Sequence, residues 1–153
     1  MQIKTTHKGK EVVLDATPEQ EAILKASEEQ DIISKINSWT WEDVIQIAKP
    51  DIDEQRLLNY NGINPRMIAT KHELELKILC DVVNEGWVWQ PGQKGWLPWF
   101  DLSSSGFRFG NSYCDHSRSF TAVGSRRCFK EEKISDACAR KFPEVFKGII
   151  LIK

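Results

Sequence analysis

The chain has 153 residues, with 21 basic and 22 acidic side chains, a formal net charge of −1 and 41% hydrophobic residues. This composition is typical of one soluble globular domain and excludes disordered, collagen-like and disulfide-stapled secreted chains. No apolar stretch approaches the roughly 20 residues of a membrane-spanning helix. Residues 1–10 also lack the apolar segment of a signal peptide. We therefore expect one domain over residues 1–153, located in the cytoplasm.

Helix start signals fill the first part of the chain, after a short strand expected at residues 12–14. Thr17, followed by proline and then by Gln20, forms a capping box, which predicts a helix start. Residues 27–30 repeat this pattern and predict a second start. Thr40 predicts a short helix that ends before the next proline.

The longest helix is predicted to begin at Asn64 and Pro65 and to stop at Gly86. From Gly86 onward the hydrophobic period changes from that of a helix to that of strands. The predicted strands of an antiparallel meander are residues 87–89, 96–102, 106–109, 119–122 and 127–129. Residues 110–118 suit a loop between two of them.

A final helix is predicted over residues 134–146, with Pro143 as a kink or a restart, and residues 149–152 suit an edge strand. The fold class expected is therefore α+β. In this fold a helical N-terminal half, residues 1–85, packs on a small antiparallel, aromatic-rich sheet with a C-terminal helix.

The two halves carry opposite charge. Residues 1–85 hold 10 basic and 16 acidic side chains, a net of −6, and residues 86–153 hold 11 basic and 6 acidic, a net of +5. The second half also contains 12 of the 15 aromatic residues. This asymmetry suggests an anionic partner for the basic half. Attraction between the two halves would explain it equally well.

Several segments of the second half share a pattern with known proteins. They are residues 84–87, 97–100, 105–107 and 123–130, followed by a helix with Ala139 and Phe142. On these residues the chain resembles a family of small uncharacterised proteins of Bacteroidetes phages and prophage-like elements. The chain departs from the family pattern at Arg127 and Pro143. The resemblance implies a phage or mobile-element setting inside a bacterial host cell, and it implies no particular chemistry.

The cysteines and the polar loop residues give little support to catalysis or metal binding. Cys80, Cys114, Cys128 and Cys138 lack zinc-ligand spacing, so we expect reduced thiols, no metal and no cofactor. Residues 114–117 place a thiol, a carboxylate, an imidazole and a hydroxyl in one expected loop. No further motif supports a nucleophile there, so we assign no catalytic residue. A hydrolase that uses Cys114 and His116 remains an alternative hypothesis.

A binding function has more support in the basic half. A glycine turn with a hydroxyl and guanidinium groups is suited to phosphate or carboxylate recognition, and neighbouring aromatic rings could stack on bases. The residues expected to form this site are Arg108, Arg118, Gly124, Ser125, Arg126, Arg127, Trp89 and Trp96. The sequence therefore favours a non-catalytic accessory protein that binds a small anionic, nucleotide-like ligand.

Other partners remain open. The pI of about 6.3 makes a nucleic-acid polymer a less favoured partner, and a membrane partner is not expected. The aromatic residues could instead fill the core between the sheet and the helices. If they are exposed, they could also contact a host or phage protein, which would make the chain an interaction or virion-associated protein.

Overall fold

A computed structural model describes residues 2–7, 10–15, 17–90, 92–103, 106–116 and 127–151 of the chain. The elements in chain order are β1 (Gln2–His7), β2 (Lys10–Asp15), α1 (Pro18–Ser38), α2 (Trp41–Ala48), α3 (Ile52–Leu58), α4 (Pro65–Val83), β3 (Lys94–Ser103), β4 (Gly106–His116), α5 (Glu132–Lys141) and α6 (Pro143–Ile150). The α+β class expected from the sequence is confirmed. Among the described residues, no helix is both long enough and apolar enough to cross a membrane.

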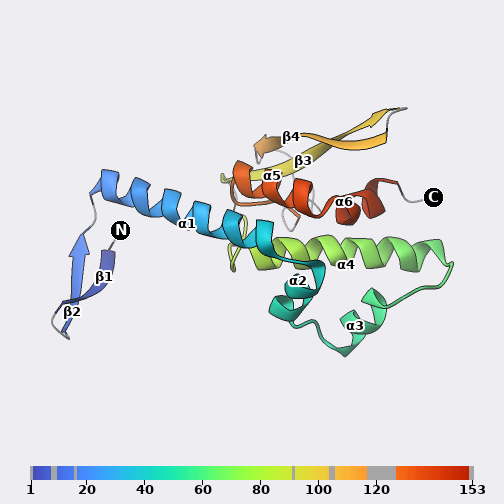
Figure 1. The fold of residues 1–153 in the computed structure, drawn as a ribbon, viewed down its shortest axis with the longest axis horizontal. Helices are drawn as coiled ribbons and strands as arrows, with labels where there is room; N and C mark the ends of the chain where they lie inside the picture. Colours follow the sequence, from blue (N-terminus) through green and yellow to red (C-terminus); the bar gives the residue numbers. More distant parts are fainter. Residues whose placement is uncertain are drawn as a thin grey trace.

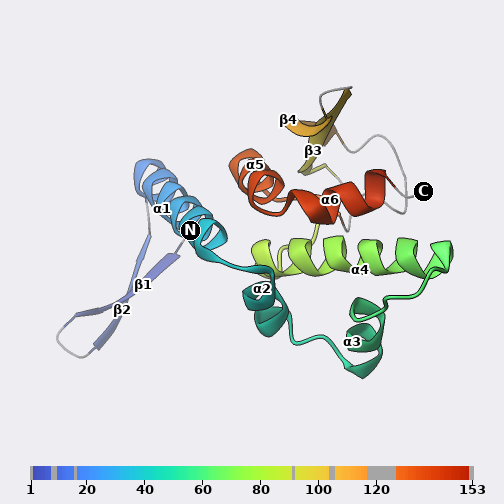
Figure 2. The ribbon, with the colours of Figure 1, turned by 45° about the vertical axis from the view of Figure 1, so that its right-hand side comes forward.

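The C-terminal helices lie between the sheet and the other helices. Figures 1 and 2 show α5 and α6 as a middle layer, with the β3–β4 hairpin on one side and α4 on the other. Helix α1 packs beside α5, and α2 and α3 lie against α4. The β1–β2 hairpin extends from the N-terminal end of α1, away from the other elements (Figure 1).

One hydrophobic core joins these layers. Its fully buried side chains come from α1, α2, α4, α5 and the segment before α5, and they include Ile32, Ile36, Val44, Leu79, Val83, Phe129 and Ile134. The sheet covers this core with partly buried aromatic rings, of which Phe100 stacks on Phe107 with ring centroids 4.4 Å apart. The aromatic-rich composition of the sheet therefore serves packing on its inner side.

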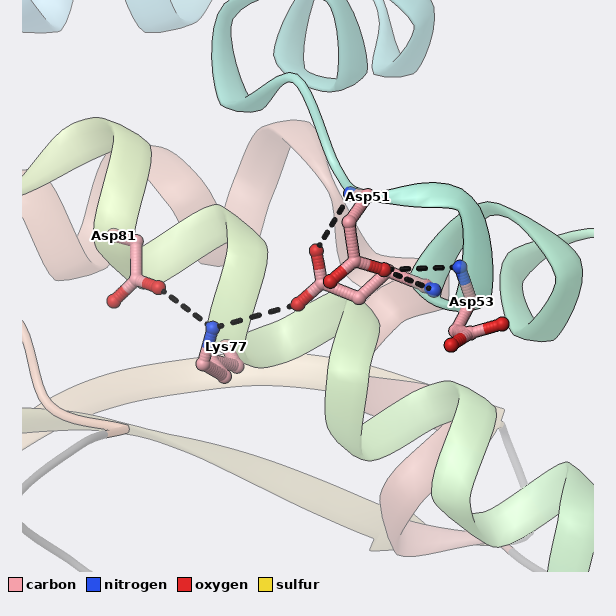
Figure 3. A network of polar contacts seen from close by, with 5 residues as sticks. Asp51, Asp53, Lys77 and Asp81 are labelled. Carbon is pink, nitrogen blue, oxygen red and sulfur yellow. Dashed lines mark hydrogen bonds and ion pairs between the residues drawn. The ribbon is translucent and has the colours of Figure 1, made fainter.

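Polar contacts connect the start of α3 to α4. The α3 N-cap residue Asp51 accepts hydrogen bonds from the backbone N–H groups of Asp53 and Glu54, both at 2.9 Å. Lys77 of α4 forms ion pairs with Asp81 at 3.1 Å and with Glu54 at 3.9 Å (Figure 3). Capping and these ion pairs together place the start of α3 next to the middle of α4.

The predicted helix starts are confirmed at Thr17, Thr40 and Asn64, where each side chain accepts a hydrogen bond from the first turn. The second start at residues 27–30 is wrong, because α1 continues unbroken through them. These residues contain no proline or glycine, and Ser, Glu and Gln are tolerated inside a helix. Helix α1, with 21 residues, is also longer than α4, with 19.

The strand predictions hold only in part. Residues 96–102 and 106–109 lie in β3 and β4, but β4 continues to His116, so the loop predicted at residues 110–118 is wrong up to that point. Residues 87–89 form no strand, because Glu85 and Gly86 have positive φ angles and turn the chain there. The predicted strand at residues 119–122 lies outside the described residues.

The structure also differs from the sequence predictions in the last part of the chain. Residues 127–129 contribute a single bridge, in which Phe129 and Trp96 exchange two backbone hydrogen bonds of 2.9 Å. The restart at Pro143 is confirmed, since α5 ends at Lys141 and α6 begins at Pro143. The edge strand expected at residues 149–152 is wrong for Ile149 and Ile150, which complete α6.

Candidate functional site

Two of the residues expected to bind a ligand, Trp89 and Trp96, lie at Gly95 at the start of β3. Trp96 is bridged to Phe129, which places Arg127 and Cys128 beside this strand. A Cβ on Gly95 would lie 2.7 Å from the Cys128 sulfur and 3.4 Å from the Trp89 ring, so only glycine permits this close approach. The structure therefore brings Trp89 and Trp96 together at Gly95, and Arg127 lies two residues before the bridged Phe129.

The side chains at this place already have partners. The guanidinium group of Arg127 forms an ion pair of 3.2 Å with Glu73 of α4. Trp96 packs against the hydrophobic core, and the half-buried Trp89 donates its indole N–H to the backbone oxygen of Gln93. The Arg127–Glu73 ion pair thus links the segment before α5 to α4, and the Trp96–Phe129 bridge links it to β3.

Arg108 lies at a different place. It is exposed on β4 and pairs in register with Asp101, five residues along β3 from Trp96. At about 3.3 Å per strand residue, this separation is roughly 16 Å along the sheet. The structure therefore does not bring Arg108 and Arg127 together. Arg118, Gly124, Ser125 and Arg126 lie outside the described residues.

The β3–β4 hairpin exposes aromatic side chains that sequence reasoning did not assign to a site. Trp99 is 61% exposed and Tyr113 is 57% exposed, and their rings meet edge to face with centroids 6.4 Å apart. They lie on the side of the hairpin that faces away from α5. We call this side the outer face, and its residues are Leu97, Trp99, Asp101, Arg108, Asn111 and Tyr113.

The pleat of the hairpin creates the outer face. Side chains alternate along each strand, so Phe107 and Phe109 pack inward while Arg108 between them points outward. The buried hydroxyl groups of Ser112 in β4 and Ser135 in α5 form a hydrogen bond of 2.7 Å, which fixes the inward side. Tyr113, the next residue, therefore points outward, next to Trp99.

The alternation in residues 107–109 is the sequence signal that indicates the outward side of Arg108. Continued strictly along the chain, it would place Tyr113 on the side of Phe107 and Phe109. Tyr113 lies on the side of Arg108 because the pairing of β3 with β4 shifts between Trp99 and Phe100. Glycine, asparagine and serine at residues 110–112 indicated a loop instead. The sequence pattern of a loop thus hid half of the outer face.

Three of the four cysteines, Cys80, Cys128 and Cys138, are buried. Burial raises the pKa of the Cys80 and Cys138 thiols far above their usual range, and burial also raises the pKa of Cys128. Cys114 is half-buried in β4, so the expected polar loop at residues 114–116 is part of a strand. Among the described residues, no group of three or more His, Cys, Asp or Glu side chains could hold a metal ion.

No protein-family model, curated protein sequence or solved structure matches this chain.

Proposed function

We propose that this chain is a non-catalytic accessory protein of a phage or mobile element, acting in the cytoplasm of a bacterial host. Its outer face would bind a small anionic, nucleotide-like ligand. The observation that carries this proposal is the exposed pair of Trp99 and Tyr113 on the same sheet face as Arg108.

The exposed rings supply a stacking surface. Burying a tryptophan side chain stabilises a fold by several kcal/mol, so an exposed tryptophan beside an exposed tyrosine forgoes stability that packing would give. Stacking of a base on such a ring contributes about 1–3 kcal/mol and tolerates any base. A planar heterocycle is therefore the part of a ligand that this pair would contact.

The charged side chains of the outer face match the rest of a nucleotide. Arg108 offers a guanidinium fork, which suits a phosphate group. The opposite residue, Asp101, offers a carboxylate that can accept hydrogen bonds from a sugar hydroxyl or an exocyclic amine. One arginine beside one carboxylate favours a compact ligand with few phosphates over a long polyanion.

Calorimetry with nucleoside mono-, di- and triphosphates, cyclic nucleotides and short oligonucleotides tests this proposal. Trp99→Ala should weaken binding about tenfold, because it removes the stacking ring. Arg108→Gln should weaken binding about fivefold or more, whereas Arg66→Gln, which removes an exposed arginine of α4, should leave binding unchanged. A panel without any binding, or binding that Trp99→Ala does not alter, would contradict the proposal.

A second function, protein interaction, is favoured by the β1–β2 hairpin. An isolated two-stranded hairpin is only marginally stable in water, and its open edges can pair with another strand. This hairpin extends away from the other elements (Figure 2). Cross-linking in infected cells and analysis of purified particles distinguish the two functions. Stoichiometric amounts of the chain in particles would favour a virion-associated role over ligand binding.

A further inference from the structure

The rings and the charged side chains of the outer face lie at successive levels along the β3–β4 hairpin. Trp99 pairs in register with Asn111. Two residues further along β3, toward the turn, Asp101 pairs with Arg108. Residues two apart on one strand share a face and are separated by about 7 Å. A ligand that stacks on Trp99 and extends toward the turn therefore meets Asp101 and Arg108 next.

Asp101 and Arg108 are opposite each other, but their charged groups do not pair. Residues directly opposite on antiparallel strands have Cα atoms about 4.5–5.5 Å apart, a separation that these two side chains can bridge. Among the described residues, however, no ion pair or hydrogen bond involves the Asp101 carboxylate or the Arg108 guanidinium group. Both side chains are exposed, so each charged group is available to a ligand.

The Asp101 carboxylate is open on the side of Trp99. It lies next to Gly110, the extra residue of β4 where the pairing shifts. A Cβ on Gly110 would lie 3.4 Å from Oδ2 of Asp101 and 3.5 Å from the backbone oxygen of Trp99, with no atom closer. Because residue 110 has no side chain, the space between this carboxylate and the level of Trp99 stays free.

A carboxylate at this place selects hydrogen-bond donors. An ionised carboxylate accepts hydrogen bonds and donates none, so it attracts hydroxyl groups and repels a phosphate group. In a nucleotide, the sugar joins the base to the phosphate and carries the hydroxyl groups. With the base on Trp99 and the phosphate on Arg108, the sugar between them comes next to the Asp101 carboxylate.

We propose that the Asp101 carboxylate accepts hydrogen bonds from the ribose hydroxyls of the ligand, so that the outer face prefers ribonucleotides to deoxyribonucleotides. This inference rests on the proposed nucleotide function and adds the class of sugar to it. The 2′ hydroxyl is the group that distinguishes the two sugars. Since hydrogen bonds to a charged group are among the stronger ones, we expect a preference of about fivefold or more.

Calorimetry with AMP and 2′-deoxy-AMP, and with GMP and 2′-deoxy-GMP, tests the sugar contact, because the members of each pair differ only in the 2′ hydroxyl. Asp101→Ala should reduce the ribose preference below about twofold by weakening only the ribonucleotide. Asp53→Ala, which removes an exposed carboxylate of α3, is the matched control and should leave the preference unchanged. Arg108→Gln should weaken both members of a pair by the same factor.

The results distinguish this inference from the proposed function. Equal binding of the two sugars, or a ribose preference that Asp101→Ala leaves intact, would overturn the inference, while binding that depends on Trp99 would keep the proposed function standing. A preference for GMP over AMP that Asp101→Ala abolishes would place the carboxylate at the edge of the base and overturn the sugar contact. Absence of binding by all four nucleotides would also overturn the inference, and the remaining members of the nucleotide panel would then decide the proposed function.

Discussion

The side chain of Asn84 supplies backbone hydrogen-bond partners that a neighbouring strand would otherwise supply. It follows the last residue of α4 and is 5% exposed. Its side-chain N–H donates to the backbone oxygen of Cys128 at 2.9 Å, and its side-chain oxygen accepts from the N–H of Lys130 at 3.0 Å. Because residues 127–129 share only one bridge with β3, this amide ties their other side to α4.

Replacing Asn84 should therefore destabilise the fold. Asn84→Ala leaves a buried backbone oxygen and a partly buried N–H without their partner, which costs about 2–4 kcal/mol. Urea denaturation measures this loss. Asn59→Ala, at an exposed position after α3, is the control and should change the unfolding free energy by less than about 0.5 kcal/mol. A loss below 1 kcal/mol for Asn84→Ala would contradict this role.

At the scale of elements, helix starts could be predicted from sequence and most strand limits could not. Capping depends on residues three positions apart, so Thr17 and Thr40 indicate their helices without knowledge of the fold. The length of β4 depends on contacts between distant residues. Its pairing with β3 continues to Lys94 opposite His116, and the buried Ser112 hydroxyl forms a hydrogen bond with Ser135 of α5. No local pattern contains that contact, so a polar segment indicated a loop where the structure has a strand.

The start of α2 gives a prediction for pH dependence. The Asp43 carboxylate accepts hydrogen bonds from the N–H and the hydroxyl of Thr40, and these bonds lower its pKa below the usual 3.8. A pKa lowered by folding contributes stability above the unfolded value, and this contribution is lost as pH falls through the folded value. Denaturation of wild type and Asp43→Asn should therefore differ near neutral pH and converge below about pH 4. An equal difference at pH 7 and pH 2 would contradict this account.

At the scale of the molecule, some of the opposite charges of the two halves form ion pairs with one another within the fold. Arg127, Lys130 and Lys133 of the basic half pair with Glu73, Glu85 and Glu29 of the acidic half, at 3.2, 3.3 and 3.0 Å. Attraction between the halves thus accounts for part of the asymmetry that suggested an anionic partner. Arg108 forms no ion pair with any described residue, and it is the arginine on which the proposed function depends.

At this scale, the residue types of the candidate site could be predicted from the sequence, but the positions of those residues could not. The sequence indicated aromatic rings beside arginine in residues 86–130, which contain the outer face. It selected Trp89 and Trp96, which the structure places in a turn and against the core, and it did not select Trp99 and Tyr113. A groove lined by Trp41, His72 and Gly148 was not indicated either, because only the packing of distant helices brings these residues together.

The indole N–H resonance of Trp99 during titration with nucleotides tests ligand binding by the outer face most directly. The outer face predicts a saturable shift of the Trp99 signal by at least one member of the nucleotide and oligonucleotide panel, while the signals of Trp89 and Trp96 stay in place. Arg108→Gln should raise the ligand concentration at half saturation about fivefold. No shift of Trp99 with any member of the panel would contradict nucleotide binding by this face.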